Sequence, residues 1–400
     1  MDYDVIVIGG GPVGLITSKE IAKEGFRVCV LEEHQEIGYP VQCSGLFSVS
    51  GLKKLGLDLP EGIIRNTIKG GRFYSPNGRK FEAYSNVERA RVVERKMFDK
   101  YLAKEAIRAG VEIKLKTKAM NAFVEDKCTV EVNSFGGDLE LSSRLLIGVD
   151  GVRSNVARWN GLKTPDKIVA AAQVEVIKAE VEQDIAEIYF GREYAPNFYG
   201  WILPKGDVYE VGVGVRGPEI TPRMYLERFM KEHPIASEKI NAKSIVELNM
   251  GAFPVGVPNE TVSDRVMIVG DAACQTKAST GGGVITGGVC GTIAAKACVR
   301  ALEEEDFSKE FLKEEYEEKW KEELGFEFEA HAFLRRFFDS MSDAQVDELF
   351  KIAIEEGIDR IMIKYRDTDR PSQFVKEFLK NERLLDWTQR ILDIGKALEW

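Results

Sequence analysis

Three glycines near the start of the chain, Gly9, Gly11 and Gly14, have G-x-G-x-x-G spacing. In this spacing the first glycine permits a tight turn, the second lets a pyrophosphate approach the backbone, and the third lets a helix pack closely against a strand. The pattern predicts a dinucleotide-binding turn. An ordinary glycine-rich turn between a strand and a helix has the same spacing, so the flanking elements must distinguish the two.

The flanking elements have the order that a dinucleotide-binding turn requires. Val5–Ile8 is a short apolar run that predicts a buried parallel strand, and Arg27–Leu31 predicts a second strand. Between them, Pro12–Glu24 predicts a helix closed by Gly25, and the N-terminus of this helix offers unpaired N–H groups to phosphates. Glu32 follows the second strand, where it can accept hydrogen bonds from an adenosine ribose, and an acid here argues against the 2′-phosphate of NADP.

Two further turns combine glycine with an acid, far along the chain. Arg144–Val156 is an apolar strand that runs into a polar turn containing Asp150-Gly151. Val266–Val269 is another apolar strand, and Gly270-Asp271 follows it. Ligands bind at such strand ends in open α/β sheets. Taken singly, a turn residue explains Asp150 and a helix cap explains Asp271 equally well.

The middle of the chain, from Ile168 to Val215, alternates with the period of two that is typical of antiparallel strands. Tyr199 and Trp201 share one face of a strand here because they are two residues apart. They are either sheet-core residues or an aromatic wall against which an apolar ligand packs.

The other elements have local signals of their own. A hairpin is predicted over Gly71–Tyr84, a helix over Val92–Gly110 and a third strand over Val111–Lys116. Pro222 begins a helix with Thr221 as its cap.

From Glu303 the chain is charged and helical to its end, with aromatic residues interleaved. These aromatics either form the core of the helices or line an apolar tunnel or bilayer contact.

Composition restricts the function classes. The 400 residues carry a net charge of −10, which argues against a general nucleic-acid role. The six cysteines include no C-x-x-C pair and the three histidines are scattered, so we expect free thiols and no metal site. No apolar run reaches the roughly 20 residues of a membrane helix. The chain opens directly into a strand, so we expect no signal peptide and a cytoplasmic location.

The glycine–acid turns, together with Arg95, resemble in their order those of the flavoproteins that include aromatic-ring hydroxylases and geranylgeranyl reductases. A narrower match is Tyr199–Lys205 with Gly212, which follows the pattern Y-x-W-x-F-P-K-x-x-x-x-x-x-G typical of geranylgeranyl reductases, with Leu203 in place of the usual Phe. Pro40–Gly45 also resembles the cysteine-containing loop of archaeal lipid reductases in this family. One departure from the family pattern is Cys274 and Ala278, where relatives often have Gly and Pro.

The resemblance implies an α/β fold with three regions. A Rossmann-like FAD-binding domain of the p-hydroxybenzoate hydroxylase type would cover 1–60, 85–165 and 255–302. An antiparallel-sheet catalytic domain would cover 61–84 and 166–254, and a helical region 303–400.

The resemblance also implies the residues of the site. Ala119, at the end of the third strand, would contact the adenine through its backbone, and the glycine run from Gly281 would begin a helix aimed at the flavin ring. Such a helix N-terminus stabilises the negative charge of reduced flavin by up to about 2 kcal/mol. The expected FAD-binding residues are Gly9, Gly11, Pro12, Val13, Gly14, Glu32, Glu33, Cys43, Ser44, Gly45, Arg95, Ala119, Asp150, Gly151, Gly270, Asp271, Gly281, Gly282, Gly283 and Val284. The expected substrate-face residues are Cys43, Tyr199, Trp201, Pro204 and Lys205.

The implied activity is FAD-dependent hydrogenation of the C=C bonds of geranylgeranyl chains in archaeal glycerophospholipids. Hydride would come from flavin N5 and the proton from Cys43, Tyr199 or an ordered water. Lys205 would orient the headgroup phosphate, or it is simply an exposed lysine at a strand end. No second nucleotide fingerprint is present, so the electron donor would be a ferredoxin-like carrier or NADPH, and the substrate implies peripheral contact with the inner face of the membrane.

Two other functions share some of these features. An aromatic hydroxylase that uses NAD(P)H and oxygen has the same FAD motifs, but the Y-x-W-x-x-P-K match argues against it. A non-catalytic flavin- or lipid-binding protein would bind the lipid and leave its mass unchanged.

Overall fold

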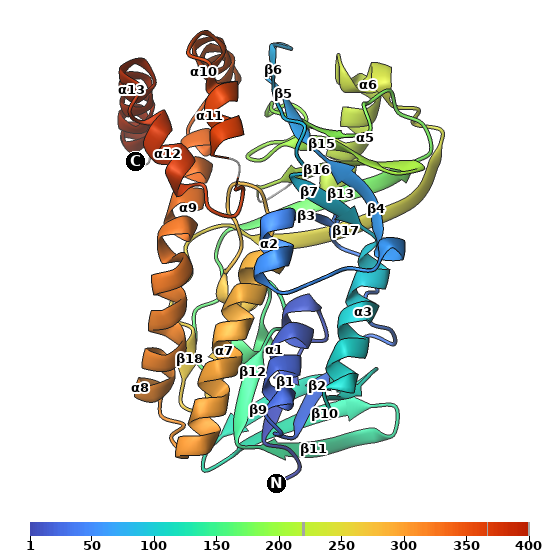
Figure 1. The fold of residues 1–400 in the computed structure, drawn as a ribbon, viewed down its shortest axis with the longest axis vertical. Helices are drawn as coiled ribbons and strands as arrows, with labels where there is room; N and C mark the ends of the chain where they lie inside the picture. Colours follow the sequence, from blue (N-terminus) through green and yellow to red (C-terminus); the bar gives the residue numbers. More distant parts are fainter. Residues whose placement is uncertain (218–220, 366, 399–400) are drawn as a thin grey trace. The chain divides into compact units, whose positions relative to one another are not determined.

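The computed structural model describes residues 1–217, 221–365 and 367–398, with side chains described up to residue 392. The chain forms two compact units (Figure 1). Unit 1 comprises Met1–Pro40, Arg95–Ile168 and Phe253–Glu329, and unit 2 comprises Val41–Glu94, Val169–Ala252 and the described residues from Ala330 on.

Unit 1 is built on a six-stranded sheet in the order β18-β19-β12-β1-β2-β8. The strands are β1 Val5–Ile8, β2 Val28–Leu31, β8 Glu112–Lys114, β12 Leu145–Gly148, β18 Val262–Ser263 and β19 Val266–Ile268. All neighbouring pairs are parallel except β18–β19 at the edge. Each residue of β1 and β2 is buried, as the unbroken apolar runs predicted.

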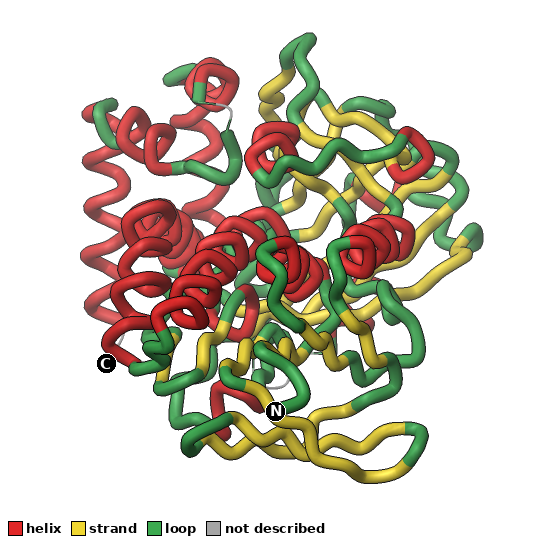
Figure 2. Tube along the Cα trace, turned by 60° about the horizontal axis from the view of Figure 1, so that its bottom comes forward, coloured by secondary structure: helices red, strands yellow, loops and turns green. Residues whose placement is uncertain are grey.

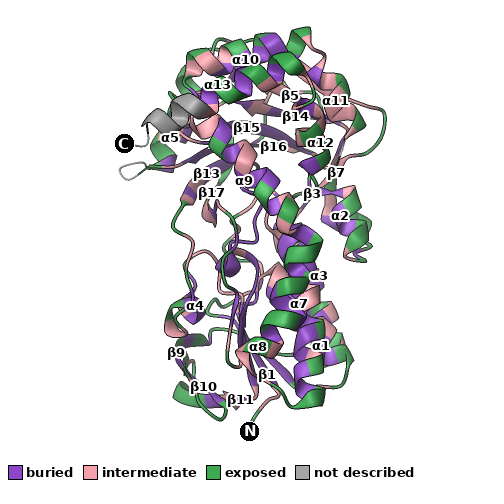
Figure 3. Cartoon of the chain, turned by 90° about the vertical axis from the view of Figure 1, so that its left-hand side faces the viewer, coloured by how far each residue is buried: buried purple, intermediate pink, exposed green. Residues whose placement is uncertain are grey.

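Helices cover one face of this sheet. They are α1 Pro12–Lys23, α3 Arg95–Arg108 and α7 Val284–Glu304, and α1 packs against the other two (Figure 1). Small residues allow α7 to approach α1 closely. A Cβ placed on Gly291 would lie 2.4 Å from Thr17 Oγ1, and one on Gly287 would lie 2.8 Å from Val13 Cγ2. Figure 3 shows how much of α7 is buried in this packing.

A three-stranded antiparallel sheet, β11-β10-β9, packs on the same sheet from the other side. Its strands are β9 Lys118–Val124, β10 Cys128–Ser134 and β11 Gly137–Ser143. They lie together near the N-terminus in Figure 2. Val130 and Val132 of β10 share a core cluster with Ile6 and Ile8 of β1. Unit 1 therefore has three layers, and short helices complete it: α4 Asn155–Trp159 and α8 Lys309–Leu312.

Unit 2 is built on a seven-stranded sheet in the order β17-β13-β16-β15-β14-β5-β6. The strands are β5 Gly70–Tyr74, β6 Lys80–Tyr84, β13 Ile168–Val176, β14 Ile185–Tyr189, β15 Gly200–Lys205, β16 Val208–Val215 and β17 Ile245–Pro254. The pairs joining β13, β16, β15 and β14 are antiparallel, as predicted, while β14 pairs with β5 in parallel. A small sheet, β3-β7-β4, also belongs to this unit, with β3 Leu46–Ser48, β4 Ile64–Ile68 and β7 Ala90–Val93.

Helices cover the large sheet at two places. On one face, Leu226 and Phe229 of α5 pack on apolar residues of β13 and β16. At the hairpin end, Phe73 and Phe81 pack against the C-terminal helices. The helices that lie wholly or in part in unit 2 are α2 Val49–Lys54, α5 Pro222–Glu232, α6 Ala236–Lys239, α9 Phe326–Asp339, α10 Asp343–Glu355, α11 Ile358–Lys364, α12 Ser372–Phe378 and α13 Glu382–Leu398.

Most aromatic residues of the tail belong to the helix core, which is one of the two interpretations offered above. Phe337, Phe378 and Trp387 are buried in one cluster with α10 and α13. Phe328 is buried against Trp320, with ring centroids 6.0 Å apart, whereas Phe326 is 56% exposed.

Three local predictions differ from the structure. The helix predicted from Val92 begins at Arg95, because Val92 and Val93 pair in β7. Thr221 precedes α5, but its side chain makes no capping hydrogen bond. Ala119 does not end the third strand: it lies inside β9, opposite Val132.

The division into two units also differs from the predicted domain bounds. Residues 41–60 and 85–94 belong to unit 2, because β3 and β7 pair with each other and with β4. The region from residue 303 on is shared between both units. The three-region division stays a prediction.

Among the described helices, α7 is the one that is long and apolar enough to cross a membrane, by length and composition. Its most apolar window is 67% buried inside the fold, as in a core helix.

Candidate functional site

The fingerprint glycines of unit 1 are required for two different physical reasons. A Cβ on Gly9, whose φ is +116°, would lie 2.4 Å from Val149 O, and a Cβ on Gly14 would lie 2.1 Å from Gly9 O. These two glycines are thus needed for the close approach of backbone to backbone. A Cβ on Gly11 would have no atom within 4 Å. The bare surface at Gly11 is what a pyrophosphate requires of the second glycine.

The N-terminus of α1 follows at once. Gly11 is its N-cap and makes no side-chain capping bond, and Pro12 begins the helix. Its first N–H groups therefore have no capping side chain, and the helix dipole favours an anion there.

Glu32 lies beside this turn and is almost completely buried. Its Oε2 accepts a hydrogen bond of 2.8 Å from Gly10 N, and its Oε1 accepts one of 2.8 Å from His34 N. The His34 ring nitrogen Nδ1 is 2.6 Å from the same Oε1. Sequence reasoning found Glu32 but missed Gly10 and His34. Glu33 forms an ion pair of 3.1 Å with Lys118.

Arg95 begins α3 and is buried. Its Nε and Nη2 donate to the two carboxylate oxygens of Asp99, at 3.1 and 3.0 Å. Burial raises the pKa of Asp99, although the guanidinium acts in the opposite direction. The charge of Arg95 also acts to lower the pKa of Asp271, so these groups lie near one another. Sequence reasoning missed Asp99.

Asp150 accepts hydrogen bonds at the start of α4, whose N-cap is Ser154. Its Oδ1 accepts from Ser154 Oγ at 2.6 Å, and its Oδ2 accepts from the backbone N–H groups of Asn155 and Val156 at 2.7 and 3.1 Å. Its turn also crowds Gly9, since Asp150 N would lie 3.2 Å from a Cβ there. The structure thus shows the turn role directly, and contact of Asp150-Gly151 with FAD stays a prediction.

Asp271 lies in the helical turn Gly270–Ala273 after β19. Its Oδ1 accepts from Thr276 Oγ1 at 2.8 Å, and loss of hydration raises its pKa. A Cβ on Gly283 would lie 2.7 Å from the same Oδ1. This contact joins the turn to the start of α7.

A buried polar network that the sequence did not reveal holds this turn. Gly270 N donates to Gln275 Oε1 at 2.8 Å, Gln275 Nε2 donates to Tyr316 Oη at 2.9 Å, and Tyr316 Oη donates to Ile268 O at 2.8 Å. Tyr316 is far from the turn in sequence, so no local pattern could identify it. Cys274 and Ala278, the departures noted above, are both buried in this loop.

The glycine run precedes α7 as predicted. Gly281 has a φ of +77°, and Gly283 is an N-cap with no side-chain capping bond. The starts of α1 and α7 are therefore both uncapped by side chains, and both lie in the unit that carries Glu32, Arg95 and Asp271. These residues fit a dinucleotide with an anionic pyrophosphate and an electron-accepting ring.

In unit 2, Tyr199 directly precedes β15 and Trp201 is the second residue of that strand. Their ring centroids are 6.1 Å apart, and Trp201 is opposite Gly212 of β16. A Cβ on Gly212 would lie 2.2 Å from Trp201 Cζ2, so the indole lies directly on the bare backbone. This packing gives a physical reason for the glycine of the pattern. Leu203, the departure from it, is buried with Ile68, Val92 and Ala186.

Lys205 is buried, with 3% of its surface exposed, so the interpretation as an exposed lysine at a strand end is wrong. Its Nζ is 2.5 Å from Glu175 Oε1 and 3.5 Å from Glu94 Oε2. Pro204, also buried, accepts a hydrogen bond of 3.0 Å from Asn66 Nδ2 through its carbonyl oxygen.

The loop Cys43-Ser44-Gly45 belongs to unit 2. Gly45 has a φ of +74°, its N–H is 3.5 Å from Cys43 Sγ, and its carbonyl accepts from Val93 N at 2.9 Å. Cys43 is partly exposed, whereas the other five cysteines are buried. Cys43 is therefore not a buried apolar residue of the core.

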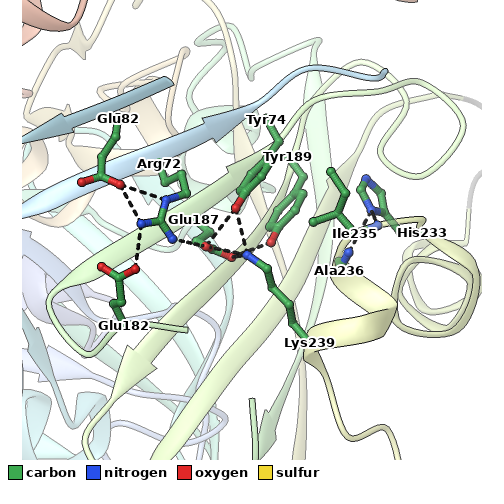
Figure 4. Close-up of polar contacts among 10 residues, drawn as sticks. All are labelled: Arg72, Tyr74, Glu82, Glu182, Glu187, Tyr189, His233, Ile235, Ala236 and Lys239. Atoms are coloured by element: carbon green, nitrogen blue, oxygen red, sulfur yellow. Dashed lines mark hydrogen bonds and ion pairs between the residues drawn. The ribbon is translucent and has the colours of Figure 1, made fainter. Parts of the chain in front are cut away.

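A second polar cluster surrounds Glu187 of β14 (Figure 4). Glu187 is opposite Ile202 of β15, so its side chain lies on the other face of the large sheet from Trp201. Glu187 is fully buried and accepts from Lys239 Nζ at 2.7 Å, Arg72 Nη1 at 3.0 Å and Tyr189 Oη at 2.5 Å. Each charge is partnered, so this cluster is structural. Among the described residues, no group of His, Cys, Asp and Glu side chains has a metal-binding arrangement.

Known proteins resemble the whole chain. The family described as "FAD binding domain" matches residues 2–288. Proteins named digeranylgeranylglycerophospholipid reductase from Methanocaldococcus jannaschii and Methanosarcina acetivorans are each 36% identical, covering 98% and 99% of this chain and 98% of their own. The crystal structure of a geranylgeranyl bacteriochlorophyll reductase-like protein from Thermoplasma acidophilum has a TM-score of 0.84 at 27% identity, covering 97% of this chain and 99% of that one.

A more distant structure supports the fold alone. A p-nitrophenol 4-monooxygenase from Pseudomonas putida has a TM-score of 0.69 at 20% identity. The predictions of FAD as cofactor and of a fold of the aromatic-hydroxylase type are confirmed. The chain therefore belongs to the FAD binding domain family and, within it, to the flavoprotein family of the archaeal digeranylgeranylglycerophospholipid reductases.

Proposed function

We propose that the protein is an FAD-dependent reductase that hydrogenates the C=C bonds of geranylgeranyl chains in archaeal ether phospholipids. The observation that carries this proposal is the similarity to lipid reductases over both units, including the strand that bears Tyr199 and Trp201. Hydroxylases of this fold share the architecture at much lower identity.

The FAD-binding residues would be those of unit 1. The uncapped starts of α1 and α7 suit negative charge, Glu32 suits the ribose hydroxyls, and Arg95 suits the phosphates. When bound and reduced, FAD supplies the hydride of the reaction. The other predicted FAD contacts, including Ala119 and Cys43–Gly45, remain part of this proposal.

The lipid-binding surface would be the aromatic region of unit 2. Phe190 stacks on Phe338 with centroids 4.9 Å apart, and its ring is 6.2 Å from that of Tyr199. A pocket beside these rings is lined by Phe198, Phe338 and Met341 among others. An isoprenoid chain offers no polar handle, but each buried CH₂ contributes about 0.8 kcal/mol, so apolar packing can hold it.

The proton donor is proposed to be Cys43, with Tyr199 or an ordered water as the alternatives. Burial raises the pKa of Tyr199, which makes its hydroxyl a weaker acid. Lys205 is already held by Glu175 and Glu94, so a role on the headgroup phosphate would require it to leave them.

The electron donor is proposed to be a ferredoxin-like carrier or NADPH, and the protein is proposed to contact the membrane peripherally from the cytoplasm.

The test is the mass of a digeranylgeranylglycerol phospholipid after anaerobic incubation with the FAD-loaded protein and dithionite. We expect stepwise gains of two hydrogens per double bond. A Gly11→Val variant is the negative control, because its side chain fits the apo fold and fills the phosphate position, and Gly136→Val is the matched control at an open glycine. An unchanged lipid mass with reduced flavin bound would contradict the proposal. Oxygen-dependent NADPH oxidation stimulated by a phenol would then support the hydroxylase, and lipid binding alone would support the carrier.

A further inference from the structure

A carboxyl group lies next to the indole of Trp201. The strand register places Trp201 opposite Gly212 and Leu203 opposite Glu210, so the side chains of Trp201 and Glu210 share one face of the sheet. Trp201 Nε1 donates a hydrogen bond of 3.3 Å to Glu210 Oε1. Glu210 is 1% exposed, so this carboxyl group is shielded from solvent.

The indole is fixed by two contacts of different kinds. Its six-membered ring lies on the bare backbone of Gly212, where a Cβ would approach Cζ2 to 2.2 Å. Its N–H edge is held by Glu210. The flat contact fixes the plane of the ring, and the hydrogen bond fixes its rotation within that plane. Gln173, opposite Gly212 on β13, occupies the neighbouring position of the same row.

The charges around Glu210 come from three strands and one loop residue. Lys205 of β15 attracts it, while Glu175 of β13 and Glu247 of β17 repel it. Glu94 shares Lys205 with Glu175. One lysine thus serves several carboxylates, of which Glu210 is buried, Glu94 and Glu175 are partly exposed and Glu247 is exposed.

This arrangement affects the ionisation of both central groups. Burial raises the pKa of Glu210 to about 7, against the lowering effects of Lys205 and of the Trp201 hydrogen bond. Burial acts to lower the pKa of Lys205, but Glu210 and Glu175 raise it overall. Lys205 therefore stays charged, and Glu210 changes charge near neutral pH.

We propose that Glu210 is a positioning residue for Trp201, and that its ionisation sets how firmly the aromatic surface of unit 2 holds an isoprenoid chain. The predicted effect on lipid binding rests on the proposed function. The coupling between Glu210 and Trp201 does not depend on that function. A carboxylate accepts a charge-assisted hydrogen bond roughly twice as strong as that of a neutral acceptor. Protonation of Glu210 therefore loosens the indole, and the KM for the lipid rises as the pH falls through neutrality.

The coupling is tested without lipid, from the indole N–H resonances of the ¹⁵N-labelled, FAD-loaded protein between pH 5.5 and 8.5. Trp201→Phe identifies one resonance among the five tryptophans. We expect the Trp201 resonance to titrate near neutral pH in the wild type and to be independent of pH in Glu210→Gln, while Glu247→Gln still titrates. A Trp201 resonance that does not titrate in the wild type, or titrates equally in Glu210→Gln, overturns the proposal. If Glu210→Gln fails to fold, a wild-type Trp201 resonance that does not titrate still overturns the proposal.

The predicted effect on lipid binding is tested by measuring kcat and the lipid KM of Glu210→Gln, of Trp201→Phe and of the variant that carries both substitutions. Loss of one charge-assisted bond is expected to raise the lipid KM by about tenfold above pH 7, with kcat within about twofold. In the Trp201→Phe background, Glu210→Gln should have no further effect on KM. An effect on kcat alone, or one that persists without Trp201, contradicts the positioning role. If no variant and no wild-type protein reduces lipid, the proposed function fails while the resonance titration still decides the coupling.

Discussion

Arg95 and Asp99 form a two-point ion pair one helical turn apart, at 3.1 and 3.0 Å, on the buried side of α3. The pair fixes a guanidinium near Asp271, in a unit whose uncapped helix starts suit phosphates. Asp99 therefore controls where the positive charge of Arg95 is presented.

Replacing Asp99 should weaken FAD binding. In Asp99→Asn, Arg95 loses its ionic partner in a buried site, and breaking such a pair costs about 3–5 kcal/mol of stability. We expect a lower free energy of unfolding and an FAD Kd raised by about tenfold, measured by titration of flavin fluorescence. Glu105→Gln removes an exposed pairing with Arg108 on the same helix and should change neither quantity measurably. Wild-type FAD affinity in Asp99→Asn would show that Arg95 needs no such anchor.

Enlarging Gly291 should separate α7 from α1. A methyl group there would lie 2.4 Å from Thr17 Oγ1, and overpacking of this kind costs about 1–3 kcal/mol. We expect Gly291→Ala to lower the urea midpoint of unfolding. Gly136→Ala, at a turn with open space, is the matched control. Equal midpoints for the two variants would mean that the helices adjust without cost.

His233 should make the stability of unit 2 depend on pH. Burial lowers the pKa of His233 to about 4, and its Nδ1 accepts from the N–H groups of Ile235 and Ala236 at 3.2 and 3.1 Å. The unfolded state binds a proton near pH 6.5 and the folded state only near pH 4, so stability is lost as the pH falls across this window. The loss should reach about 3 kcal/mol in chemical denaturation curves. His233→Asn should flatten this slope, and an unchanged slope would assign the pH dependence to other groups.

The source of the proton should be revealed by Cys43 and Tyr199. If Cys43 is the acid, Cys43→Ser should lower kcat by tenfold or more at saturating lipid, with FAD binding retained. Tyr199→Phe should keep most of its turnover, because burial raises the pKa of that hydroxyl. Cys29→Ser, at a buried thiol of unit 1, controls for loss of a sulfur. Wild-type turnover in both Cys43→Ser and Tyr199→Phe would leave an ordered water as the donor.

Local sequence patterns predicted those structural features that depend on residues close together in the sequence. Gly9, Gly11 and Gly14 were recognisable because the turn, the strand and the helix that need them are adjacent in sequence. The period of two likewise placed Tyr199 and Trp201 on one strand face. Helix boundaries were predicted less exactly. The helix α3 begins at Arg95 because Val92 and Val93 belong to β7, which pairs with β3 and β4 from earlier in the sequence.

The residues that were missed depend on distant partners. Gln275 meets Tyr316 across 41 residues, and the pairing of Glu210 with Trp201 depends on the register of two strands. Asp99 follows Arg95 by four residues, which places the two side chains on the same side of a helix. Many exposed ion pairs have this spacing, so only the burial of the Arg95–Asp99 pair distinguishes it from them. The burial of Lys205 was hidden for the same reason, since its partner Glu175 lies on another strand.

The close packing of α1 against α7 also constrains how the protein is made. The helix Val284–Glu304, which packs on Pro12–Lys23, is synthesised more than 260 positions after it. Until then the side of α1 that packs on α7 lacks its partner, although α3, which also packs on α1, is already made, and strands of unit 2 are synthesised in between. Contacts between segments so far apart in sequence form slowly, and apolar surface stays exposed until they form. The side of α1 that packs on α7 therefore stays uncovered in the nascent chain until Val284–Glu304 has been synthesised.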